Sequence, residues 1–156
     1  MFRRSESNLP EDPKFPADLA ALGFKLNEQG QFVKVSNESE FFNFFASDNE
    51  RSNEKRKEVM HVCAREAVRQ AAAEHGVVEV YLCGKDGKDI SMTKPNGPHL
   101  RIFVTDLEVL KQKKDVVVVV GEHNQDVGIW ACRSLMREGG IDGGSVVGLV
   151  KKLEGE

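Results

Sequence analysis

The sequence predicts an α/β domain with a central parallel strand, a long amphipathic helix and an N-terminal β-hairpin. Val116 to Val120 are five consecutive valines, and an unalternating β-branched run is typical of a strand covered on both faces. Apolar side chains recur at helical spacing between residues 59 and 72. Two short segments of alternating apolar and polar residues flank a turn at residues 27–30. These three patterns determine the predicted fold class.

The composition predicts one globular domain and excludes several classes of protein. The chain has 156 residues, of which 40% are hydrophobic and 30% charged, and this length is enough to bury a core. A net charge of -3 provides no general attraction to phosphate backbones, which argues against direct nucleic-acid binding. No apolar run has the length of a signal peptide or a membrane span. We therefore expect an intracellular protein, in the nucleus, the cytoplasm or both.

The first third of the chain predicts a lead-in, a hairpin and an aromatic anchor. Residues 1–14 are polar and contain two prolines, so we expect a flexible segment. Residues 15–24 predict one helical turn that ends at Gly23, and the hairpin pairs residues 24–26 with residues 31–35. Four phenylalanines follow, and we expect them to anchor the hairpin to the body, with a partner-facing patch as the alternative; they are Phe41, Phe42, Phe44 and Phe45.

A long helix is predicted to begin near a capping box of Ser47 and Glu50 and to end at about His75-Gly76. Basic residues cluster near its start, but acidic residues interleave with them at three- and four-residue spacing. A solvated helix face is therefore the better interpretation than a basic patch.

The second half of the chain alternates predicted strands and helices. Strands are expected at residues 77–82 and 100–104, with a turn at 84–88 and a loop up to Pro98. A brief helix is expected at residues 106–110, and a second one contains Ile129 to Met136 and ends at Gly139-Gly140. After a turn at 141–145, Ser145 is the expected N-cap of a last helix at 146–153.

The loop after the valine run is the default site for a function, because ligands of open parallel sheets bind beyond the carboxyl ends of strands. His123 lies between Glu122 and Asp126 and could be an oriented general base, but no nucleophile accompanies it. The Gly143-Gly144-Ser145 segment lacks the last glycine of a serine elbow. The histidines and cysteines show no metal-ligand spacing, and no phosphate-binding loop is present. We therefore predict no catalytic residue, no metal site and no cofactor.

Three stretches of the sequence resemble one known family. Phe15-Pro16-Ala17-Asp18-Leu19 and the segment from Gly23 to Gln31 are similar to an F-P-x-D-L stretch followed by G-[YF]-x-x-N-E-x-G-Q. The helix at residues 51–62 is the second stretch, and the valine run with its loop and Ile129-Trp130-Ala131 is the third. These motifs belong to the domain of Argonaute-binding protein two, which the chain resembles from about residue 15 onward.

The resemblance implies a three-layer α/β-hydrolase-like fold for residues 15–156, in which the loop takes the place of an oxyanion-hole loop. Val120 stands where the family has histidine, which argues against an active oxyanion site. The resemblance also implies that only the first half of the family domain is present, so that the domain would be truncated. Its implied role is RNA-directed or heterochromatic gene silencing, with Argonaute or chromatin-modifying proteins as partners.

The leading hypothesis is a non-catalytic protein-interaction module that uses the loop. Its expected contact residues are Gly121, Glu122, His123, Asn124, Asp126, Gly128 and Trp130. The rival hypothesis is that the chain is part of a hydrolase-like enzyme, which another chain or a longer form of this protein completes. A third hypothesis is that the chain is a domain that binds a small molecule or RNA in the cleft above Val120. Because the valine strand needs neighbours on both sides, we also expect an exposed sheet edge through which the chain could form a homodimer.

Overall fold

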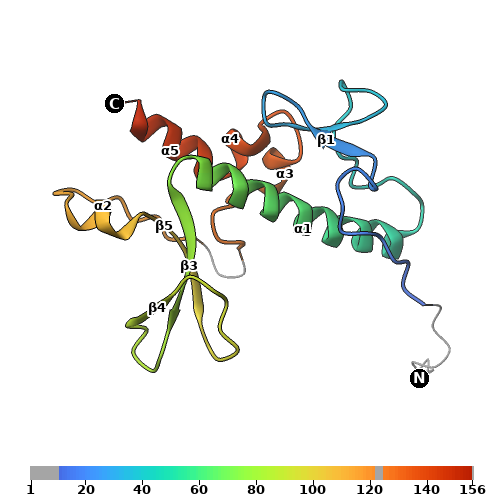
Figure 1. Cartoon of the computed structure of the whole chain (residues 1–156). Helices are drawn as coiled ribbons and strands as arrows, with labels where there is room; N and C mark the ends of the chain where they lie inside the picture. The colour runs from blue at the N-terminus through green and yellow to red at the C-terminus, as the bar shows by residue number, and fades with distance from the viewer. Residues whose placement is uncertain (1–10, 122–124, 156) are drawn as a thin grey trace.

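The computed structural model describes residues 11–121 and 125–155. It is a mixed α/β structure in which helices and small antiparallel sheets alternate along the chain (Figure 1). The elements are β1 (Phe24–Leu26), β2 (Phe32–Lys34), α1 (Glu50–Glu74), β3 (Val77–Cys83), β4 (Asp89–Ser91), β5 (Leu100–Thr105), α2 (Leu107–Lys111), α3 (Cys132–Leu135), α4 (Gly140–Gly144) and α5 (Val146–Glu154). The predicted lead-in lies mostly outside the described residues.

Helix α1 is the long central element against which the other parts pack. Its buried side chains are spaced four residues apart and form one stripe: Met60, Ala64, Val68 and Ala72. The helix ends where predicted, with His75 as C-cap and Gly76 at φ 68°. The predicted capping box is wrong, because the N-cap is Asn49, whose Oδ1 accepts the Ser52 N–H at 3.0 Å. An asparagine cap uses the same chemistry two residues further along the chain.

The N-terminal hairpin is confirmed, and one of the four phenylalanines fixes it to α1. β1 pairs antiparallel with β2 in a register that places Phe24 opposite Lys34. Phe42 is fully buried, and its ring lies 5.5 Å from the Phe24 ring and 5.1 Å from the Phe44 ring. Arg56 of α1 stacks 4.6 Å above the Phe42 ring, so this one residue departs from the predicted solvated face. The expected anchor is therefore formed mainly by Phe42.

β3 is the middle strand of a three-stranded sheet with the order β4-β3-β5. The register places Val80 opposite Ile102 and Glu79 opposite Phe103. β4 lies in a segment that was predicted to be a loop. It contains one apolar residue in three, so it gives no periodic signal, and it forms because the turn after β3 brings it alongside that strand.

The central parallel strand is not confirmed. Val116 to Val120 lie outside every described strand, and their side chains are 53–87% exposed. Every strand pair in the described residues is antiparallel, so the three-layer hydrolase-like layout is not confirmed either. A doubly covered strand needs a neighbour on each edge and a layer on each face. The described chain provides neither for the valine run.

The C-terminal part folds into three short helices rather than two longer ones. The helix expected from Ile129 to Met136 is reduced to α3, and the expected turn at 141–145 is mostly α4. The Trp130 and Ala131 N–H groups both donate to the Gly144 carbonyl, at 3.1 and 3.3 Å. These bonds hold the start of the predicted helix in an extended conformation. Ser145 is the N-cap of α5, as predicted.

Candidate functional site

The described part of the loop lies at the point where α1, β5 and the C-terminal helices meet. Gly121 is exposed at the end of the valine run, whereas Glu122, His123 and Asn124 lie outside the described residues. Ile129 is buried in the core and bridges to Ser145, which fixes the far end of the loop. The loop residues that remain for the site are therefore Asp126, Gly128 and Trp130.

Asp126 joins two arginines that come from different elements. Its Oδ1 accepts a hydrogen bond from Arg65 Nη1 of α1 at 3.3 Å and lies 3.6 Å from Arg101 Nη2 of β5. The Asp126 side chain is only 25% exposed. A partly buried carboxylate between two guanidinium groups has its charge compensated within the domain, which fixes the direction of its side chain.

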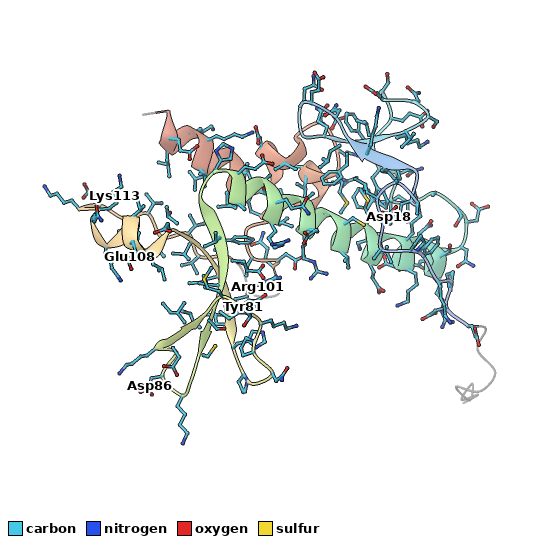
Figure 2. The ribbon with its side chains drawn as sticks, viewed as in Figure 1. Asp18, Tyr81, Asp86, Arg101, Glu108 and Lys113 are labelled. Carbon is cyan, nitrogen blue, oxygen red and sulfur yellow. The ribbon has the colours of Figure 1, made fainter. Side chains whose placement is uncertain are left out.

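The charge network continues across the sheet to Glu79 and Tyr81 of β3. Arg101 Nη1 lies 3.7 Å from Glu79 Oε2, and the Tyr81 hydroxyl donates a hydrogen bond to Glu79 Oε1. This hydrogen bond raises the pKa of Tyr81. Figure 2 shows Tyr81 and Arg101 side by side on the sheet. A chain of ion pairs and one hydrogen bond thus runs from α1 to β3 through Arg65, Asp126, Arg101, Glu79 and Tyr81.

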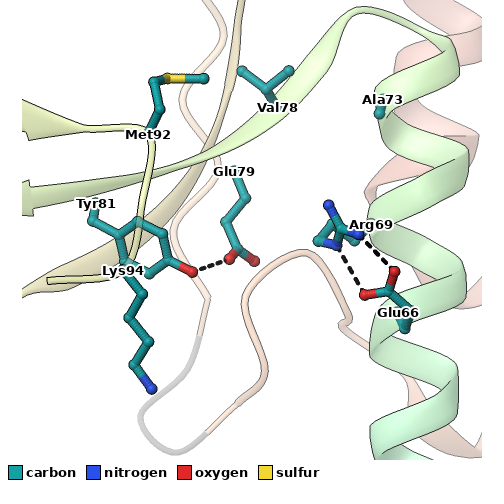
Figure 3. Close-up of a pocket in the computed structure, with 8 residues that line it drawn as sticks. All are labelled: Glu66, Arg69, Ala73, Val78, Glu79, Tyr81, Met92 and Lys94. Atoms are coloured by element: carbon teal, nitrogen blue, oxygen red, sulfur yellow. Dashed lines mark hydrogen bonds and ion pairs between the residues drawn. The ribbon is translucent and has the colours of Figure 1, made fainter.

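Two adjoining clefts open between α1 and the sheet. The larger, of about 710 Å³, is lined by residues from the segment before β1, from α1, β3 and β5, and by Val127 of the loop. The smaller, of about 470 Å³, lies between α1 and the β3-β4 end of the sheet, and Figure 3 shows the residues around it. Glu66, Arg69 and Glu79 line both clefts. The clefts therefore form one surface whose walls mix apolar and charged side chains, and Asp126 lies beside it.

Gly128 brings the loop into contact with the sheet. Its φ is 78°, and a Cβ added there would lie 2.8 Å from two carbon atoms of the Phe103 ring. Its carbonyl also accepts the Val146 N–H at 2.8 Å. Glycine is required here for two independent reasons, backbone conformation and space.

Replacing Gly128 by alanine is expected to lower the free energy of unfolding by about 2 kcal/mol, since the left-handed conformation and the overlap with Phe103 both cost energy. Urea denaturation followed by circular dichroism measures the change. Gly121→Ala is the matched control, because Gly121 has no positive φ and its Cβ would approach only one side-chain atom, Gln125 Oε1, at 3.2 Å. Equal stability of the two variants would contradict the close approach at Gly128.

Trp130 is exposed on the surface next to this network. Its side chain is 38% exposed, and its backbone carbonyl accepts a hydrogen bond from Gln125 Nε2 at 2.8 Å. It precedes α3, although the sequence pattern placed it inside a helix. A fixed, partly exposed tryptophan combines a large apolar area with a polar N–H group.

Several reactive side chains near the described part of the loop have environments set by burial and backbone contacts. Burial raises the pKa of the Cys63 and Cys132 thiols, which keeps them protonated at neutral pH. Burial is also the main cause that lowers the pKa of His61, whose Nε2 has no hydrogen-bond partner among the described residues. Ser145 is fully buried and donates its hydroxyl hydrogen bond to the Ile141 carbonyl at 2.6 Å, so it is a structural cap.

In the ranges 11–121 and 125–155, no group of three or more potential ligands is placed to hold a metal ion. Within the same ranges, no helix combines the length and apolar character needed to cross a bilayer. The described part of the loop can make hydrogen bonds and aromatic contacts with another molecule.

Sequence reasoning identified Asp126, Gly128 and Trp130 but missed Arg65, Glu79, Tyr81 and Arg101. The available signal was the position of the charges in the strands. Glu79 and Arg101 are each the one charged residue in an otherwise mostly apolar strand, and alternate residues of a strand share a face. Only the register of β3 with β5 shows that these two charges lie on the same face.

Comparison with known proteins identifies the family. Residues 15–156 match the family model of the Arb2 domain, which covers more than half of the chain. The chain belongs to the Arb2 domain family. This confirms the resemblance to Argonaute-binding protein two, and the matched range includes the candidate site, from Arg65 to Trp130. No curated protein and no solved structure matches the chain.

Proposed function

We propose that this Arb2 domain is a non-catalytic protein-interaction module whose contact surface is the loop from Gly121 to Trp130 together with the cleft beside it. The observation that supports the proposal most is the pair of ion pairs that Asp126 makes with Arg65 and Arg101. Two arginines from α1 and β5 hold this carboxylate, and the loop also bonds to the C-terminal helices. A surface segment whose described residues, such as Asp126, Gly128 and Trp130, are held in this way binds a partner with little loss of conformational entropy.

The chemistry of the loop supports a protein partner. Trp130 presents apolar area and an indole N–H, and tryptophan is among the residues that contribute most to binding energy at interfaces. The neighbouring charges are paired within the domain, so their net effect on the field around the loop is small. This argues for protein over nucleic acid, whose binding depends on an excess of cations.

The partner that we propose is an Argonaute protein, or a chromatin-modifying protein that acts with Argonaute. The name of the Arb2 domain family is the support for this choice. The domain would then act in RNA-directed or heterochromatic gene silencing, in the nucleus or moving into it.

Binding of the purified chain to the purified Argonaute of the same cells tests this function. We expect a measurable dissociation constant for the wild type and at least about a tenfold weaker one for Trp130→Ala, because removing a central tryptophan from an interface commonly costs 2 kcal/mol or more. Phe45→Ala is the matched control, since Phe45 is another exposed aromatic residue, at 79%, outside the loop. Surface plasmon resonance measures the three constants.

The outcomes separate the parts of the proposal. Absence of wild-type binding would contradict the Argonaute partner, and equal losses in both variants would contradict the loop as the contact surface. Turnover of an activated ester by the wild type that disappears in Glu122→Ala/His123→Ala would favour the rival hydrolase hypothesis.

A further inference from the structure

The valine run presents a strand-forming sequence whose backbone has no partner among residues 11–121 and 125–155. The exposed fractions of Val116 to Val120 are 53, 64, 77, 55 and 87%. In the described part of the chain, no hydrogen bond joins the backbone of these residues to another residue. The run contains no proline, glycine or charge, the residue types that normally prevent pairing of exposed strands. Exposed apolar area of this kind is expected to become buried in an interface.

The outer edge of β5 is the complementary feature of the fold. β5 is an edge strand of the sheet, six residues long, and it pairs with β3 on one side only among the described residues. It contains neither proline nor lysine. Its one charged residue, Arg101, has its charge compensated by Glu79 and Asp126. An unprotected edge of this length accepts a further strand.

One face of β5 suits a neighbour that consists of valines. On this face, Leu100, Ile102 and Val104 lie opposite aliphatic residues of β3. The other face carries Phe103, which packs against the hydrophobic core, and Arg101, whose charge Glu79 and Asp126 compensate. The valine run is apolar on both faces, so it would extend the aliphatic face and place apolar side chains on the Phe103 side.

We propose that Val116 to Val120 of one copy pair as a β-strand with the outer edge of β5 in a second copy of this chain. Each copy carries one strand to donate and one edge to accept it, so a two-fold arrangement uses both pairs at once. Within one chain the run does not pair with its own β5. Helix α2, which separates them, has no buried residue and projects away from the rest of the molecule (Figure 1). Because α2 is not packed in the core, the valine run that follows it can reach the β5 edge of a second copy. The inference does not depend on the proposed function.

Analytical ultracentrifugation of the full chain at increasing concentration tests the proposal. We expect a monomer that converts to a dimer of defined mass. Val118→Lys should weaken the dimer by roughly a hundredfold, because a lysine in the donated strand places a charge among the apolar side chains of the sheet and disfavours strand pairing. Val118 is 77% exposed, so the monomer of this variant should keep its fold, which circular dichroism checks. Ile90→Lys is the matched control, since Ile90 is an exposed aliphatic residue of β4, at 50%, and should leave the dimer intact.

Hydrogen exchange identifies the paired segments. The amides of Val116 to Val120 and of the β5 edge should become protected as the concentration rises, and this protection should be absent in Val118→Lys. A wild-type chain that is monomeric at every concentration would overturn the proposal, as would aggregates of no defined mass or an unchanged dimer of Val118→Lys. Protection that does not depend on concentration would also overturn it, because the run would then pair within its own chain.

Discussion

Phe42→Ala is expected to lower the free energy of unfolding by about 3–5 kcal/mol, the usual cost of removing a buried aromatic ring. Phe42 has no exposed surface and contacts the rings of Phe24 and Phe44. Its ring also lies below the guanidinium group of Arg56. The substitution therefore leaves a cavity at the place where the N-terminal hairpin meets α1, and the two elements should separate early in unfolding. Urea denaturation followed by circular dichroism measures the loss.

Phe45→Ala provides the control for this prediction, because the same side chain is removed three residues further along the chain. Phe45 is 79% exposed, so its replacement should change the free energy of unfolding by less than about 0.5 kcal/mol. A large loss of stability in Phe45→Ala together with a small loss in Phe42→Ala would contradict the burial of Phe42 and the exposure of Phe45. The pair thus tests the choice between a structural anchor and an exposed aromatic patch.

Gly148→Ala is expected to destabilise the domain by about 3 kcal/mol, although alanine is the better helix former. In a helix without close neighbours, this substitution would stabilise by roughly 0.5–1 kcal/mol. At Gly148 of α5, however, the added Cβ would lie 2.1 Å from the backbone oxygen of Asp142 in α4. A backbone atom cannot rotate away, so α4 and α5 must move apart, and overpacking of this kind costs more than the gain in propensity.

The sign of the change decides this prediction. Gly155→Ala, at the end of the same helix, has no neighbour closer than 3.6 Å and should alter stability by only a few tenths of a kcal/mol. Differential scanning calorimetry of the three proteins gives the order of their melting temperatures. A Gly148→Ala variant that melts above the wild type would contradict the contact between α4 and α5.

The candidate site was only partly predictable, because some of its residues lie far apart in the sequence. Asp126 was found because it lies in a polar loop that follows a conspicuous apolar run. Its partners Arg65 and Arg101 lie 61 and 25 residues before it in the sequence, and no local pattern links them to the loop. Ion pairs between distant residues depend on the packing of α1 against the sheet, which the sequence pattern does not specify.

Local interactions determined the elements that the sequence alone predicted. The apolar stripe of α1, the glycine at its end and the Ser145 cap of α5 depend on residues within a few positions of one another, so composition and spacing are sufficient. Tertiary structure decided which phenylalanine is buried, how far α3 extends and whether the valine run forms a strand. A strand requires backbone partners from elsewhere in the molecule, and β propensity cannot supply them. Among the described residues, none provides these partners for Val116 to Val120.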